Sequence, residues 1–182
     1  KYDPFGNLLW ATLYETSGNQ DAHGAAMDGG GNTYVIGGTS NSVPRMPIVA
    51  KISSAGTVLW GQTISDLSDD CQVNGVVGDP TGGIVVGGWS ATPCVGCASG
   101  GFLRKLDAAG GVVWTRTLTS QISAVAYGVI GGAHCILATS MGGSRVDVWQ
   151  VDAATGDDIA QAIEVVRALN ATGSGPLSPS AT

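Results

Sequence analysis

A phrase of about a dozen residues occurs three times in this chain, at intervals of about fifty residues. The copies read DGGGNTYVIGGTS (28–40), GDPTGGIVVGGWS (78–90) and IGGAHCILATS (130–140). Each copy places a glycine-containing turn before a short apolar run that ends in serine. A period of this length is typical of a supersecondary unit that buries its apolar face against its neighbours. We therefore expect a row of similar units.

A second signature keeps the same phase. It consists of a lysine, a glycine five residues later and a tryptophan four residues after that. It occurs as Lys1, Gly6, Trp10, as Lys51, Gly56, Trp60 and as Lys105, Gly110, Trp114. Four short strand candidates fit in each period, which favours a β-propeller blade over a helical repeat. At this constant phase the tryptophans are expected to be buried between units, because large aromatic side chains dominate such contacts.

These patterns predict an all-β fold, namely a β-propeller segment of about three four-stranded blades plus a partial N-terminal blade. We expect residues 1–18 to end the partial blade, 19–64 and 65–118 to form two blades, 119–166 to form a degenerate blade, and 167–182 to be a Ser/Pro-rich tail or linker. A propeller needs roughly four to eight blades to close. The expected partners are therefore other protein chains or missing blades of the same propeller.

The first copy carries a family resemblance. The run KYDPFGNLLWATLYETSGNQDAHGAAMDGGGNTYVIGGTSN resembles the SBBP repeat, which is named for the seven-bladed β-propeller. Repeats of that family pair a Lys-x-Asp-x-x-Gly-x-x-x-Trp hairpin with an Asp-x-x-Gly-Asn-x-Tyr-Val-x-Gly strand. The likeness covers residues 1 to about 157 and weakens along the chain. A weaker likeness relates LDAAGGVVW (106–114) and VDAATGD (151–157) to the tryptophan-docking repeats of quinoprotein propellers, where the tryptophan has a structural role.

Composition excludes two classes of partner. Only 12% of residues are charged and the formal net charge is −6, with the acidic residues scattered along the chain. This argues against binding to nucleic acid. No apolar run of about 18 residues is present, so no membrane-spanning helix is expected.

The cysteines bear on the cellular compartment. Cys71 lies between two expected blades, and Cys94 and Cys97 lie in a loop of the following blade that emerges on the same face. A disulfide from Cys71 to Cys94 or Cys97 is the favoured interpretation, and the alternatives are buried thiols or a metal or redox site. Cys135, in a strand, is expected to be a small core residue.

The end of the chain points the same way. Asn170 begins an N-glycosylation triplet, and a Ser/Pro-rich segment follows it. With a possible disulfide, these features favour an extracellular or cell-surface location.

No catalytic, cofactor-binding or metal-binding residues are predicted. The four aspartates at repeat boundaries are expected to be turn formers and not calcium ligands, because the spacing of a calcium loop is absent. They are Asp28, Asp79, Asp107 and Asp152. Neither His23 nor His134 has a nucleophile nearby in a turn that suits catalysis.

The predicted function is a non-catalytic scaffold or interaction module. Loops 40–47 and 90–101 are expected on one face, where they and the loops between blades meet a protein or glycan partner. The candidate contact residues in or beside these loops are Arg45, Met46 and Trp89. The alternative is a fragment of a quinoprotein-like oxidoreductase or a propeller hydrolase whose catalytic residues lie outside this segment.

Overall fold

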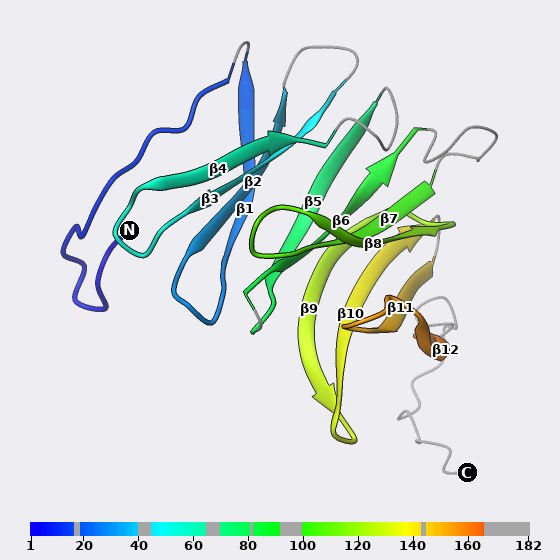
Figure 1. The fold of residues 1–182 in the computed structure, drawn as a ribbon. Coiled ribbons are helices and arrows are strands. Elements are labelled where there is room, and N and C mark those ends of the chain that lie inside the picture. The colour runs from blue at the N-terminus through cyan, green and yellow to red at the C-terminus, as the bar shows by residue number, and fades with distance from the viewer. Residues whose placement is uncertain are drawn as a thin grey trace, which may run out of the picture.

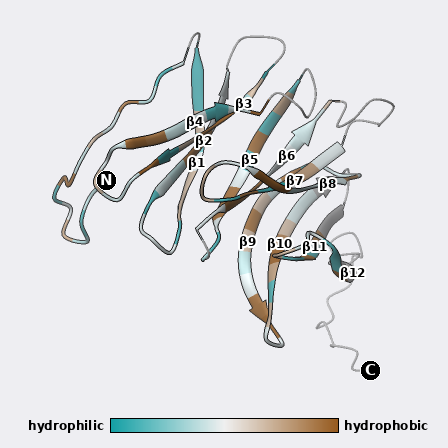
Figure 2. Cartoon of the chain, in the orientation of Figure 1, coloured by the Kyte–Doolittle hydropathy of each residue, from teal (hydrophilic) through white to brown (hydrophobic). Residues whose placement is uncertain are grey.

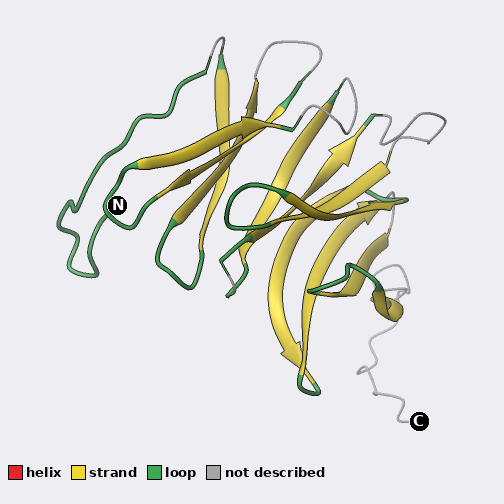
Figure 3. Ribbon diagram, viewed as in Figure 1, coloured by secondary structure: helices red, strands yellow, loops and turns green. Residues whose placement is uncertain are grey.

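The computed structural model describes residues 1–16, 19–39, 45–64, 70–80, 82–91, 100–142 and 145–165. Twelve strands in these residues form three four-stranded antiparallel sheets, and none of the described residues is helical (Figure 3). The predicted all-β class is therefore confirmed.

Each sheet is formed by four consecutive strands, paired in chain order. The first sheet contains β1 (Gln20–Met27), β2 (Thr33–Thr39), β3 (Pro47–Ile52) and β4 (Val58–Thr63). The second contains β5 (Cys71–Gly78), β6 (Ile84–Ser90), β7 (Gly100–Leu106) and β8 (Val112–Leu118). The third contains β9 (Ile122–Ile130), β10 (Ala133–Gly142), β11 (Arg145–Asp152) and β12 (Asp158–Val165). Residues 1–16 run beside the first sheet, with one bridge between Tyr2 and Leu8.

The three sheets lie side by side in chain order (Figure 1). The first strand of each sheet makes the contact with the preceding sheet: β5 packs against β1, β2 and β3, and β9 packs against β5, β6 and β7. Two apolar layers result, one on each side of the second sheet. The neighbouring residues Val85 and Val86 belong to different layers, because successive side chains of a strand point to opposite faces. Apolar residues accordingly occur within β5 and β9, the strands that pack against the preceding sheets (Figure 2).

Glycine allows the second and third sheets to approach closely. A Cβ added at Gly87, in β6, would lie 2.7 Å from Cγ2 of Ile122 and 2.9 Å from Cγ1 of Val125 in the third sheet. Real Cβ atoms do not tolerate such contacts, so a larger residue at this position would push the sheets apart.

The repeated lysines join neighbouring sheets. Lys51 Nζ lies 3.5 Å from Asp28 Oδ2 and donates a 3.0 Å hydrogen bond to the carbonyl of Ala108 in the second sheet. Lys105 Nζ in turn lies 2.6 Å from Asp79 Oδ2 and donates to the carbonyl of Ala153 in the third sheet, at 2.7 Å. The constant phase of the lysine therefore reflects a repeated contact between sheets.

The repeated tryptophans also contact the next sheet. We expected them to be buried between the sheets, but they are only half-buried. Trp10 Nε1 donates to the carbonyl of Ser54, and Trp60 Nε1 to that of Ala108. The rings of Trp10, Trp60 and Trp114 lie against Gly56, Gly110 and Gly156, the positive-φ glycines of the following hairpin turns. Each indole remains partly accessible because it covers an exposed turn, and Trp60 and Trp114 also pack against the buried clusters.

Candidate functional site

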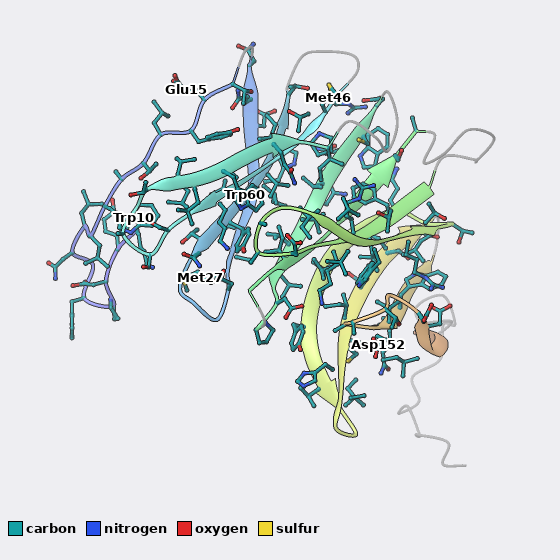
Figure 4. The ribbon with its side chains drawn as sticks, in the orientation of Figure 1. Trp10, Glu15, Met27, Met46, Trp60 and Asp152 are labelled. Atoms are coloured by element: carbon teal, nitrogen blue, oxygen red, sulfur yellow. The ribbon has the colours of Figure 1, made fainter. Side chains whose placement is uncertain are left out.

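A cluster of polar groups lies at one end of the sheets, where β2 and β6 end and β3 and β5 begin. Met46 marks this end at the top of Figure 4, whereas Met27 and Asp152 lie toward the opposite end. We call the cluster at the junction of the first and second sheets the rim site. It consists of Asp21, His23, Arg45, Asp70, Gln72 and Trp89.

An ion pair fixes the guanidinium of Arg45. Its Nε and Nη2 donate to Oδ1 and Oδ2 of Asp70 at 2.9 and 3.0 Å, and the backbone N–H of Arg45 donates to Oδ1 at 3.1 Å. These hydrogen bonds lower the pKa of the Asp70 carboxyl below its ordinary value, and the same pair raises the pKa of Arg45. Both groups therefore stay charged, in a bidentate geometry that only a guanidinium can form.

The structure brings together two of the three residues predicted to face a partner. The guanidinium carbon of Arg45 lies 4.7 Å from the centre of the Trp89 ring, within the range of a cation–π contact. Met46 has a different role, because its backbone pairs with Thr39: Met46 N donates to Thr39 Oγ1 at 3.0 Å, and Thr39 N donates to the Met46 carbonyl at 3.1 Å. It closes the end of the β2–β3 pair.

A directional hydrogen-bond chain connects the two sheets beneath this contact. His23 Nδ1 lies 2.6 Å from the carbonyl of Val73, and a carbonyl only accepts, so Nδ1 carries the proton. His23 Nε2 is then the acceptor for the amide Nε2 of Gln72, at 3.3 Å. The Oε1 atom of Gln72 accepts from Trp89 Nε1 at 3.1 Å. The histidine tautomer and the amide orientation both follow from this network.

Sequence reasoning missed His23 and Gln72 as parts of this site. The sequence contained a signal for this contact. β1 and β5 each have a β-bulge, and His23 in β1 and Asn74 in β5 are the residues at these bulges. Asn74 Nδ2 donates to the carbonyl of Ile122 in the third sheet at 2.8 Å, as His23 does to Val73. A polar residue repeated at the bulge position of the first strand of two successive sheets therefore indicated a contact between sheets.

A small polar pocket of about 200 Å³ opens beside this chain. Asp21, His23, Thr39, Arg45 and Gln72 contribute polar groups to its wall. The carboxylate of Asp21 is exposed and forms no hydrogen bond or ion pair with any residue that the structure describes. The pocket therefore offers both hydrogen-bond donors and a charged acceptor.

An apolar groove runs along the face of the first sheet that is turned away from the second sheet. Two adjoining pockets of about 300 and 450 Å³ form it, and Val35 and Ile52 line both. Residues 10–16 cover only part of this face, where Thr12 Oγ1 donates to the carbonyl of Gly56. We call this the outer groove. Its lining continues onto Ala25 and the exposed Met27.

The predicted turn role of the aspartates is confirmed at three positions. Asp28 Oδ1 accepts the backbone N–H groups of Gly30 and Asn32. Asp107 and Asp152 likewise accept backbone N–H groups of the residues that follow them in their turns. Asp79 forms the ion pair with Lys105 described above. Within the described ranges, no group of three or more His, Cys, Asp and Glu side chains is arranged to hold a metal ion.

Three further sequence predictions fall wholly or partly outside the described ranges. Cys71 is buried at the start of β5, but Cys94 and Cys97 belong to residues 92–99, which the structure does not describe. Asn170 also lies outside them, as do residues 40–44 of the first predicted loop. Cys135 is buried, as expected of a small core residue, and its thiol lies 3.6 Å from the carbonyl of Gly128.

No protein-family model matches the chain, and no curated protein matches it. Among the residues with described structure, no helix is long and apolar enough to cross a membrane. Function is therefore inferred from the geometry of the rim site.

Proposed function

We propose that this chain is a non-catalytic, extracellular or cell-surface scaffold of the SBBP-type β-propeller kind, and that it binds a protein or glycan partner at the rim site. The observation that carries the proposal is the rigid presentation of Arg45, which is held on Asp70 at 2.9 Å and stacked over Trp89 at 4.7 Å. The Arg45 side chain is 42% exposed, so its outer edge is accessible to a partner.

The residue types at the rim suit recognition. Arginine and tryptophan are enriched among the few residues that supply most of the binding energy at interfaces. Here both are fixed before binding, because Asp70 holds the guanidinium and Gln72 holds the indole N–H. A pre-ordered site loses less conformational entropy when a partner binds.

The rim offers little for catalysis. Both ring nitrogens of His23 are engaged by Val73 and Gln72, so this histidine is not available as a general base. The positive charge of Arg45 is neutralised by Asp70. These assignments favour an interaction module over an enzyme.

Three observations support the propeller arrangement. Consecutive four-stranded sheets stack in chain order, the first strand of each sheet makes the contact with the preceding one, and the same lysine-to-carbonyl hydrogen bond joins successive sheets. The outer groove leaves apolar surface uncovered on the first sheet, which suits further sheets of the same kind. Such sheets would come from missing blades or other chains.

Site-specific cross-linking tests the proposal. A photoreactive amino acid replaces Met46 at the rim or, as the matched control, the exposed Ile130 at the β9–β10 turn, at the opposite end of the sheets. The protein is incubated with the extracellular fraction of its native source. We expect a partner to cross-link at position 46 and not at position 130, and Arg45→Ala to abolish the product. Equal labelling at both ends, or labelling that survives Arg45→Ala, would contradict a rim-directed function.

A further inference from the structure

We propose that the pocket of the rim site binds one hydroxyl-rich sugar ring, the terminal residue of a glycan. This inference rests on the proposed function and names the chemical class of its ligand. It follows from the hydrogen-bonding groups that remain after the internal contacts of the rim are counted.

The pocket retains several donors. Arg45 uses Nε and Nη2 to bind Asp70, and the two N–H groups of Nη1 have no partner among the described residues. Gln72 donates one amide hydrogen to His23 and has a second. The hydroxyl of Thr39 accepts from Met46 N and keeps its own proton to donate.

One group in the pocket accepts only. The carboxylate of Asp21 lies on the same wall as these donors and has no described partner. An anionic ligand would be repelled by the charge of Asp21, and an ammonium-type cation has no acceptor for the donors of Arg45, Gln72 and Thr39. A hydroxyl group both donates and accepts, so adjacent hydroxyls satisfy Asp21 and the donors together. The arrangement therefore favours a neutral polyol over an ion.

The size of the pocket limits the ligand to one ring. Its volume of about 200 Å³ is below the roughly 300–1,000 Å³ of sites that enclose drug-sized molecules. Asp21 is exposed at the margin, so the rest of a glycan chain can extend into solvent. The Trp89 indole holds the oxygen of the Gln72 amide and thereby turns the amide nitrogen toward His23 at the pocket wall.

The test uses four methyl glycosides, those of glucose, galactose, mannose and N-acetylglucosamine, titrated separately into the 15N-labelled chain. The readout is the indole N–H signal of Trp89, which senses the ligand through Gln72. We expect saturable shifts of this signal with at least one glycoside. Asp21→Asn should weaken binding about tenfold, as expected for loss of a hydrogen bond to a charged group. Its melting temperature should be unchanged, because Asp21 has no described partner.

Asp157→Asn is the matched control, since Asp157 is an exposed carboxylate in the third sheet's hairpin turn, at the opposite end from the rim. It should bind the glycoside like the unmodified chain. Absence of a shift with all four glycosides, equal affinities of the two variants, or saturable binding of acetate or methylammonium in their place would overturn the sugar assignment. If Met46 still cross-links a partner while the glycosides fail, the proposed function stands and only this inference falls. If both experiments fail, neither proposal stands.

Discussion

At the scale of single residues, the most consequential contacts are the two lysine–aspartate pairs. The side chains of Lys51 and Asp28 are only 7% and 1% exposed, and each lysine of the two pairs also binds a carbonyl of the next sheet. Removing one partner of a buried pair leaves an uncompensated charge, which costs more than the pair itself contributes. The repeated lysine was visible in the sequence. Its partner was not, because Asp28 and Asp79 also fit a simple turn role.

We expect Lys51→Met to lower the free energy of unfolding by about 3–5 kcal/mol, because the charge of Asp28 stays buried without its partner. Urea unfolding followed by tryptophan fluorescence measures the loss. Arg116→Met is the control, since Arg116 and Asp158 form a more exposed pair that should contribute at most about 1 kcal/mol. Similar losses in the two variants would show that burial does not set the importance of these pairs.

The same site predicts a dependence of stability on pH. Burial opposes ionisation of Asp28, but hydrogen bonds from Asn32 and the charge of Lys51 outweigh it and lower the pKa of Asp28. An aspartate with a lowered pKa in the folded state stabilises the fold fully above its unfolded pKa of about 3.9. That contribution is lost as the pH falls through the folded-state pKa.

We therefore expect Asp28→Asn to be most destabilising near pH 7, with the difference from the unmodified chain shrinking toward pH 3. Urea unfolding at pH 7, 5, 4 and 3 provides the measurement, and Asp157→Asn controls for the loss of an exposed carboxyl. A difference that stays constant across this range would mean that the ionised form of Asp28 is not what stabilises the fold.

At the scale of strands and turns, the repeat predicted most of the structure. The apolar runs became central strands, and the glycines before the tryptophans became hairpin turns. The faces of β2 were harder to predict. The repeated phrase aligns Gly37 with Gly87. In the structure, however, the equivalent of Gly87 is Ile36, because the two residues pair with Gly75 and Gly24, which follow the bulges of β5 and β1. A shift of one residue moves every side chain to the other face, and spacing alone does not reveal it.

The hairpin turns provide a matched test of the tryptophan contact. Gly56 has φ of 91° and a Cβ there would lie 2.8 Å from Cγ of Trp10, whereas Gly6, at the same point of its hairpin with φ of 86°, has nothing within 4 Å. Gly6→Ala should cost about 1–2 kcal/mol from backbone strain alone. Gly56→Ala should cost about 1–3 kcal/mol more, because the ring must also move. Thermal unfolding of both variants measures this difference, and equal losses would show that Trp10 does not constrain the turn.

At the scale of the whole molecule, the three sheets differ in how well their faces are covered. Val35, Val86 and Ala138 occupy the same position in the second strand of successive sheets. Each comes one residue before the partner of the first residue after the β-bulge, which is Gly24, Gly75 or Ala124. Val86 and Ala138 are fully buried against the preceding sheet, whereas Val35 is only half-buried in the outer groove. The sequence predicted similar units but not this inequality, because burial depends on which neighbour is present and not on the repeat itself.

The inequality predicts self-association through the outer groove, since exposed apolar surface of this kind favours contact between molecules. The average mass measured by light scattering should rise with protein concentration, and Val35→Lys should suppress that rise by placing a charge in the groove. Because Val35 is half-buried, the lysine can extend into solvent and the free energy of unfolding should change by less than about 1 kcal/mol. Val86→Lys is the contrasting variant: it places the same charge at the equivalent, fully buried position and should unfold the chain. If Val35→Lys associates like the unmodified chain, the groove is not the contact surface.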